Sequence, residues 1–136
     1  YFIRHRNFEL WLDRKELTDL YKKDSSFIIR CANNGRAGYY SFESVNYPGR
    51  FIRHANFLFF LHASDGSALF KNDSSFRVVN PRNGQAGQSY YSLESSNYPN
   101  FFLRHNYFRI KLNQAANNNL YNNDATWHIV GGNISS

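Results

Sequence analysis

The sequence predicts an all-β protein built from three similar repeats, and three observations support this prediction. Short motifs recur along the 136 residues at offsets of 49 and 51 positions. Apolar and polar side chains alternate with a period of two, as over Phe108–Asn113, and this alternation is typical of a half-buried strand. No stretch keeps an apolar stripe at helical spacing over three turns, so long helices are not expected.

The repeats are defined by an Arg-His pair and by an Asp that follows the His nineteen residues later. Superposing these motifs gives a single domain built from a unit of about 50 residues, with repeats at residues 1–36, 37–87 and 88–136, of which the first is incomplete. A Ser-x-Glu-Ser-x-Asn-Tyr-Pro segment occupies residues 41–48 and returns at 92–99. No copy of it precedes the first Arg-His pair, so the first repeat is expected to lack its upstream strand.

Each complete repeat is expected to contain four short strands, which the middle repeat shows at residues 39–44, 51–54, 57–62 and 75–79. Asp65–Ser67 predicts a tight turn between the third and fourth of these strands. Three such repeats correspond to twelve strands. A closed barrel with a pseudo-threefold axis, a β-trefoil, is the favoured arrangement, because an open solenoid would leave unpaired edges.

The same alternation predicts the core. In the first repeat Phe8, Leu10 and Leu12 occupy the inward positions, and the other two repeats have apolar residues at the equivalent places. Two further sets of equivalent apolar residues are expected to form core layers around the axis. They are Leu20, Leu69 and Leu120, and Phe27, Phe76 and Trp127.

Composition excludes several classes of protein. A single cysteine, Cys31, rules out an internal disulfide and a cysteine-rich zinc site. No run of about 18 apolar residues is present, so no membrane insertion is expected. No basic segment leads into an apolar one at the start of the sequence, so no signal peptide is expected there. A mature secreted protein would have lost it, and a secreted, extracellular location is expected. The net charge of +6 permits an acidic partner without establishing one.

The recurring polar residues are the candidate binding residues. An Asp carboxylate can accept hydrogen bonds from two adjacent hydroxyls, and a His nitrogen adds a directional donor or acceptor. An aromatic residue three positions before each Asp could cover the apolar face of a sugar. These residue types suit a small carbohydrate pocket on each repeat. The three sets are His5, Tyr21 and Asp24; His54, Phe70 and Asp73; and His105, Tyr121 and Asp124.

Spacing alone leaves a structural interpretation of the same residues open beside the binding one. Asp before two small residues often caps a turn through its own backbone, and a repeated His can be a core residue with a satisfied hydrogen bond. The repeated Arg is expected to be structural and to pair with Glu43 and Glu94. The repeated Asn-Tyr-Pro is interpreted as a turn, in which Pro fixes φ.

Catalysis, metal binding and nucleic-acid binding fit the sequence poorly. Glycosidases use one special pair of carboxylates, whereas the repeated carboxylates here come in threes. One His and one Asp per repeat fall short of the ligands that zinc prefers, so no metal and no cofactor are expected. Eight of the 16 basic residues lie in the first 36 positions beside five acidic ones, a pattern more typical of a solvated face than of a phosphate-binding track.

Three segments resemble a known family closely. They are Ser41–His54, Asp65–Phe70 and Asp73–Phe76, and they are similar to the AbfB domain, the arabinofuranose-binding module of carbohydrate-binding module family 42. The resemblance extends over essentially all 136 residues and occurs three times. Two departures are Tyr107, which stands where the other repeats have Asn, and Asn100, which stands in place of Gly49.

This resemblance implies a β-trefoil and a non-catalytic role. Members of the family are attached to α-L-arabinofuranosidases and bind terminal L-arabinofuranose side chains of arabinoxylan or arabinan, through a His and an Asp in each repeat. A catalytic domain is then expected as a covalent neighbour. The alternatives are a free-standing, lectin-like protein for another glycan and a basic module that binds acidic polysaccharide or nucleic acid.

Overall fold

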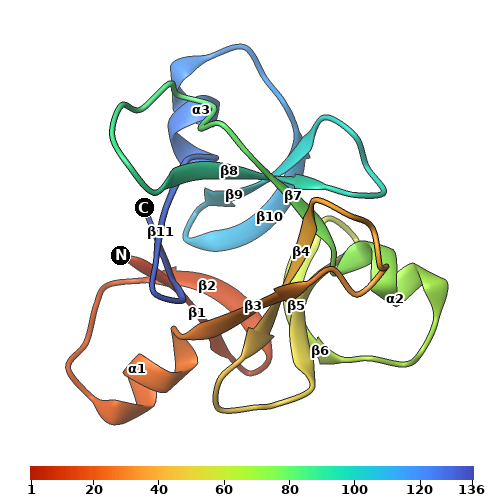
Figure 1. Cartoon of the computed structure of the whole chain (residues 1–136). Coiled ribbons are helices and arrows are strands. Elements are labelled where there is room, and N and C mark those ends of the chain that lie inside the picture. The colour runs from red at the N-terminus through yellow and green to blue at the C-terminus, as the bar shows by residue number, and fades with distance from the viewer.

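The structure, a computed structural model that describes residues 1–136, is dominated by β-strands and contains three short helices (Figure 1). The prediction of an all-β class is therefore confirmed, although each repeat also contains one short helix. The elements are β1 Phe2–Arg6, β2 Glu9–Asp13, α1 Asp19–Asp24, β3 Phe27–Cys31, β4 Tyr39–Ser44, β5 Arg50–Ala55, β6 Leu58–Ala63, α2 Ala68–Asp73, β7 Phe76–Val79, β8 Tyr90–Ser95, β9 Phe101–Asn106, β10 Arg109–Gln114, α3 Asn119–Asp124, β11 Trp127–Val130 and β12 Asn133–Ser135.

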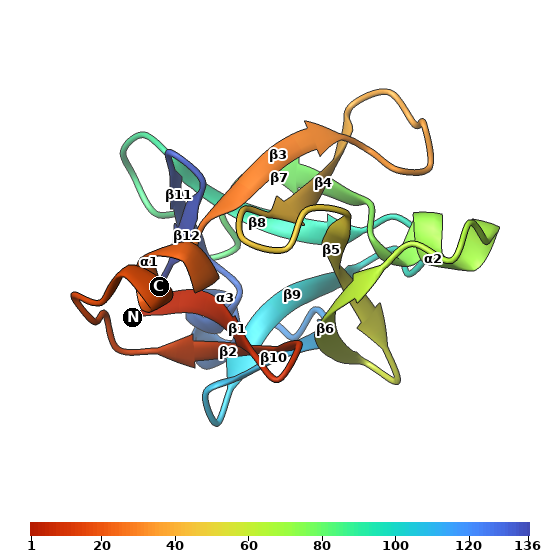
Figure 2. The same cartoon turned by 90° about the horizontal axis from the view of Figure 1, so that it is seen from below.

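The strands form six antiparallel hairpins in two sets. One set comprises β1–β2, β5–β6 and β9–β10, and the other comprises β3–β4, β7–β8 and β11–β12. The pairs β12–β1, β4–β5 and β8–β9 join the two sets, and β2, β6 and β10 pair with one another. The strands therefore close into a barrel, with the helices on its outside (Figure 2). None of the helices is long and apolar enough to span a bilayer.

The C-terminal strand β12 occupies the place that the first repeat was expected to leave empty. It pairs with β11 on one side and with β1 on the other. Its contact with β1, Phe2 opposite Ser135, matches Phe51 opposite Glu43 in the next repeat. All twelve strands are thus present within the chain, and the two termini lie side by side (Figures 1 and 2).

The main cluster of the core consists of fifteen buried apolar residues, and they fall into five sets of three equivalent positions. The sets are Ile3, Ile52 and Leu103; Leu10, Phe59 and Ile110; Leu12, Leu61 and Leu112; Phe27, Phe76 and Trp127; and Phe42, Leu93 and Ile134. The prediction for Phe27 and its equivalents is confirmed. Phe8 only packs against this core from a partly buried position, and its equivalents Phe57 and Phe108 are exposed.

The prediction that Leu20, Leu69 and Leu120 form a core layer was wrong. Their exposed fractions are 65%, 64% and 71%. Each lies one position before the buried aromatic residue of a short helix, and successive residues of a helix point in different directions. The helices were missed because six residues are too few to show an apolar stripe.

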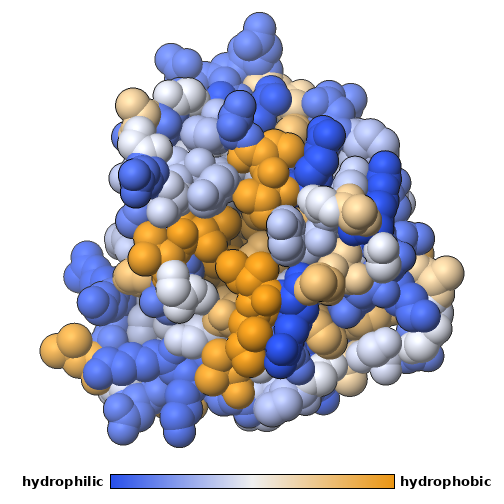
Figure 3. All heavy atoms as spheres, viewed as in Figure 1, coloured by the Kyte–Doolittle hydropathy of each residue, from blue (hydrophilic) through white to orange (hydrophobic).

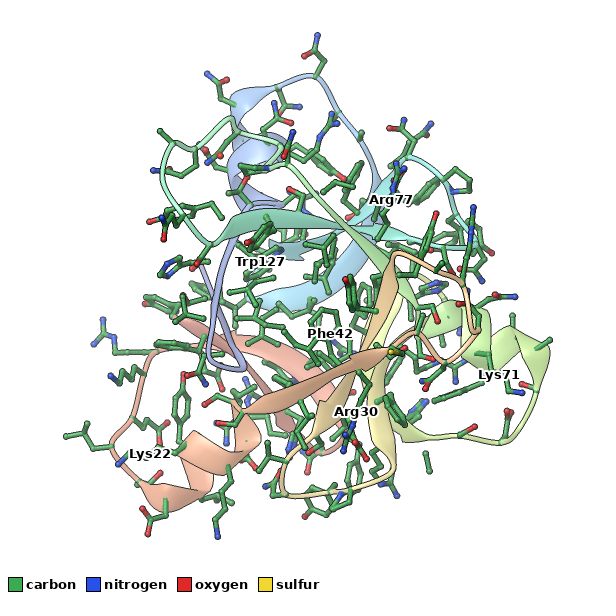
Figure 4. All side chains as sticks on the ribbon, viewed as in Figure 1. Lys22, Arg30, Phe42, Lys71, Arg77 and Trp127 are labelled. Carbon is green, nitrogen blue, oxygen red and sulfur yellow. The ribbon has the colours of Figure 1, made fainter.

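An apolar hollow opens in the middle of the face seen in Figure 1. It measures about 500 Å³ and is lined by Ile29, Tyr40, Phe42, Val78, Tyr91 and Ile129. Figure 3 shows the apolar residues gathered around this hollow. In Figure 4 Phe42 and Trp127 lie near the middle of the barrel, whereas Lys22 and Lys71 lie on the outlying helices.

Candidate functional site

The His-Asp pair of each repeat is built on an ion pair between the repeated Arg and the repeated Asp. Asp24, Asp73 and Asp124 are the last residues of α1, α2 and α3, and all three are buried. In each repeat an Arg Nη2 donates to an Oδ2 of the Asp at 2.6 Å. The donors are Arg4, Arg53 and Arg104.

The predicted partners of the repeated Arg were therefore wrong. Glu43 accepts a hydrogen bond from Arg30 at 2.8 Å, and Glu94 accepts one from Arg77 at 2.6 Å, both at the surface. Each Glu also accepts from the backbone N–H that closes the following loop, at Gly49 in one repeat and at Asn100 in the next. Both of these residues have a positive φ, and Asn tolerates that conformation better than most residues do. The loop therefore keeps its shape when Asn replaces Gly.

Each His lies beside the Asp of its own repeat, as the sequence suggested. The distances between His Nε2 and Asp Oδ1 are 3.5, 3.6 and 3.5 Å for His5, His54 and His105. The β1, β5 and β9 strands carry the histidines, and the short helices present the carboxylates to them.

In the first and second sites an Asn from the next repeat bridges the pair. Asn46 donates from Nδ2 to Asp24 at 2.8 Å, and its Oδ1 lies 2.8 Å from Nε2 of His5. Asn97 makes the same contacts with Asp73 and His54, at 2.8 and 3.0 Å. Each of these sites is therefore shared between two repeats.

The third site differs from the other two. Its His105 contacts Asp124 but no Asn side chain. The exposed fraction of the His105 side chain is 25%, compared with 4% for His5 and His54. Aligned on Phe42, Leu93 and Ile134, the position equivalent to Asn46 and Asn97 falls after Ser136, the last residue of the sequence.

The aromatic residues predicted to form sugar-stacking walls do not face solvent. Tyr21, Phe70 and Tyr121 are only 1–3% exposed. The guanidinium carbon of the repeated Arg lies 5.1–5.3 Å from the centre of each ring. The rings therefore pack against the Arg of each ion pair. Burial also raises the pKa of Tyr121 to about 12.

Two other aromatic residues lie at the surface of the first and second sites. Tyr47 packs edge-on against His5, with ring centres 5.4 Å apart, and Tyr98 packs in the same way against His54 at 5.5 Å. Both tyrosines remain exposed, and each also contacts the Phe of the adjacent hairpin turn. They are better placed than the buried rings to cover an apolar face of a ligand.

Asn46, Tyr47, Asn97 and Tyr98 are the residues that the sequence analysis missed as site residues. They belong to the repeated Asn-Tyr-Pro, which was interpreted only as a turn. A signal was present, because Asn and Tyr recur together where a turn alone would tolerate other residues. The partners of each Asn lie in the preceding repeat, and local spacing does not reveal that.

The charges at these sites are largely compensated. Each carboxylate is paired with a guanidinium, and burial lowers the pKa of His54 and His105, which favours neutral imidazoles. No group of three or more His, Cys, Asp and Glu side chains in the chain is arranged to hold a metal ion. The sites therefore suit hydrogen bonding to an uncharged, polar ligand.

Comparison with known proteins gives two kinds of match. The model of the alpha-L-arabinofuranosidase B (ABFB) domain family matches residues 1–78 and 79–136. An arabinofuranosidase crystal structure with arabinofuranosyl-alpha-1,2-xylobiose is 27% identical with a TM-score of 0.78, covering 90% of this chain and 26% of that one. A GH54 α-L-arabinofuranosidase soaked with a cyclic sulfate inhibitor is 29% identical with a TM-score of 0.75 and the same coverage.

More distant structures show likeness of fold alone. A structure of BEL described as a beta-trefoil is 17% identical with a TM-score of 0.58, covering 93% of this chain and 89% of that one. No curated protein matches the chain. The chain spans about a quarter of the arabinofuranosidases that it resembles. Because the family model covers the chain from end to end, this protein belongs to the AbfB domain family.

Proposed function

We propose that this domain is a non-catalytic β-trefoil module that binds terminal L-arabinofuranose side chains of arabinoxylan or arabinan. A carbohydrate-binding role follows from membership of the AbfB family. The single observation that carries the proposal of arabinofuranose binding is a cluster of Asp, His and Asn with an exposed Tyr beside it, in which an Arg compensates the charge of the Asp. This cluster occurs twice.

Each cluster offers a small sugar several hydrogen-bonding groups and one apolar surface. The carboxylate oxygens have lone pairs beyond those used by Arg and Asn, and they can accept from hydroxyls. One small sugar covers little surface, so affinity at a single site is expected near the millimolar range, about −4 kcal/mol. Two or more sites on one branched polymer would raise the apparent affinity through effective concentration.

The expected partner in the same polypeptide is a catalytic domain, and the expected location is extracellular. The arabinofuranosidase structures support this proposal because the chain covers only 26% of their length. Plant polysaccharides are too large to cross a membrane, so a module that binds them acts outside the cell.

Calorimetry tests the proposed function directly. We expect an arabinofuranosyl xylo-oligosaccharide to bind with little dependence on salt, and galactose and heparin not to bind. Tyr98→Ala should weaken binding at the second site several-fold by removing its exposed aromatic surface. Tyr107→Asn is the matched control, because it restores the residue of the other two repeats at an exposed turn outside the cluster.

Two outcomes would contradict the proposal. Binding of galactose in place of the arabinoside would indicate a lectin for another glycan. Binding of heparin that weakens steeply with salt would indicate a basic module for acidic polymers, because such binding releases counterions.

A further inference from the structure

The orientation of the bridging Asn is determined by the carboxylate that it contacts. An ionised carboxylate can only accept hydrogen bonds. In the first site the group that faces Asp24 must therefore be the Nδ2 of Asn46, which lies 2.8 Å from Oδ1. The second site repeats this contact between Asn97 and Asp73 at the same distance. A flipped amide would place two acceptors against each other.

The amide oxygen then faces the imidazole and a serine. Asn46 Oδ1 accepts a hydrogen bond from Ser44 Oγ at 3.0 Å, and Asn97 Oδ1 accepts one from Ser95 Oγ at 2.9 Å. The same oxygens lie 2.8 and 3.0 Å from Nε2 of His5 and His54. Because an amide oxygen cannot donate, each Nε2 must carry the proton.

In a neutral imidazole with its proton on Nε2, the other nitrogen is an acceptor. Nδ1 of His5 and of His54 makes no hydrogen bond within the protein. The only side-chain polar atoms that are both fully enclosed and unpaired are Arg109 Nε and Asn122 Oδ1. Nδ1 of each histidine therefore keeps some contact with solvent.

We propose that Asn46 and Asn97 are positioning residues that hold His5 and His54 in the Nε2–H tautomer, so that each free Nδ1 accepts a hydrogen bond from a sugar hydroxyl. This inference rests on the proposed function for its ligand, but its account of the tautomer stands without one. It makes binding at these two sites depend on a residue of the following repeat. The inference does not extend to His105, which contacts Asp124 without a bridging Asn.

The tautomers can be measured without any ligand. Long-range ¹H–¹⁵N spectra of the imidazole rings at pH 7.5 should show His5 and His54 as neutral Nε2–H tautomers. Asn97→Ala should weaken the preference of His54 for this tautomer, which only the more distant Asp73 Oδ1 at 3.6 Å then supports, and should leave that of His5 unchanged. Asn46→Ala should have the reverse effect. A purely structural role for Asn would not give this reciprocal pattern. A wild-type His54 in the Nδ1–H form would overturn the inference.

Binding of an arabinofuranosyl xylo-oligosaccharide tests the second part of the proposal, that Nδ1 accepts a hydrogen bond from a sugar hydroxyl. Asn97→Ala should lower affinity at one site about tenfold, the loss expected for one hydrogen bond. Asn97→Asp should be no better, although it keeps the shape of the side chain, because a second carboxylate favours imidazolium and Nδ1 would then donate. Thermal melting of each variant identifies loss of fold, and the Asn46 variants repeat the test independently.

The possible failures are distinguishable. If wild-type protein shows the predicted tautomers but binds no arabinoside, the proposed ligand is wrong and the role of Asn in the histidine tautomer stands. If Asn97→Ala changes the tautomer and leaves binding unchanged, Nδ1 is not the acceptor and the inference fails.

Discussion

The buried Arg-Asp pair explains why the repeated carboxylate is both structural and a candidate for binding. In the second repeat Asp73 accepts from Arg53 and from Asn97 through different oxygens. Removing this carboxylate would leave the partly buried Arg53 without its partner, and removing one member of a largely enclosed ion pair is destabilising. Its truncation would therefore lower stability and binding together, and the exposed Tyr98 is the cleaner probe of binding.

The histidines should make folding stability depend on pH. Burial lowers the pKa of His54 and of His105 below the ordinary value of 6.5, so the unfolded chain binds more protons as the pH falls below that value. This contribution to stability is fully present above pH 6.5 and is lost as the pH falls toward the pKa of the folded state.

The melting temperature should accordingly fall between pH 7.5 and pH 5.5, a range in which most carboxylates stay ionised. His54→Gln should reduce the slope of this dependence, and His105→Gln should reduce it separately. Thermal melts followed by circular dichroism at several pH values give the slope. A stability that does not change over this range would mean that neither imidazole is kept neutral by burial.

At the scale of elements, each short helix begins at a side-chain cap. Thr18, Ser67 and Asn118 accept a hydrogen bond from the backbone N–H three residues later. The tight turn predicted at Asp65–Ser67 between two strands was wrong, because a bend at Gly66 leads from β6 into α2 and not directly into the next strand. Ser67, the last residue of the predicted turn, is the cap of α2. Three different residue types fill one role, because each has an oxygen that can reach the same N–H.

Ser67→Ala should lower the free energy of unfolding by about 1 kcal/mol, because it leaves that N–H without its partner. Ser67→Thr and Ser67→Asn introduce the caps of the other two repeats and should retain most of the stability. Urea denaturation of the three variants measures the difference. A loss for Ser67→Asn as large as that for Ser67→Ala, with Ser67→Thr unaffected, would show that the hydroxyl contact with Asp65 matters more than the cap.

At the scale of the whole molecule, the three repeats form one core and cannot be stable separately. Four of the five core sets take one residue from each repeat, and the fifth takes Phe42 from the second repeat and Leu93 and Ile134 from the third. The strand β12 closes the barrel by pairing with β1. Unfolding is therefore expected to be a single cooperative transition, as in most domains of this size.

Leu61→Ala should destabilise the domain by roughly 2–5 kcal/mol, because it leaves a cavity in the fully buried core. Leu69→Ala is the matched control, and its effect should be below about 0.5 kcal/mol because that side chain is exposed. Denaturation curves of the two variants decide between the observed packing and the core layer predicted from sequence. A large loss for Leu69→Ala would favour the predicted layer.

The sequence by itself determined the three repeats, the strand class, most inward-facing core positions and the pairing of each His with its Asp. These features are local or are repeated, so alternation and spacing reveal them. Only the tertiary structure decided that β12 completes the barrel, that the repeated Arg pairs with Asp and that Asn46 and Asn97 complete the sites. The Asn and His of each site are 41 or 43 residues apart, and contacts over such separations depend on how the closed barrel brings neighbouring repeats together.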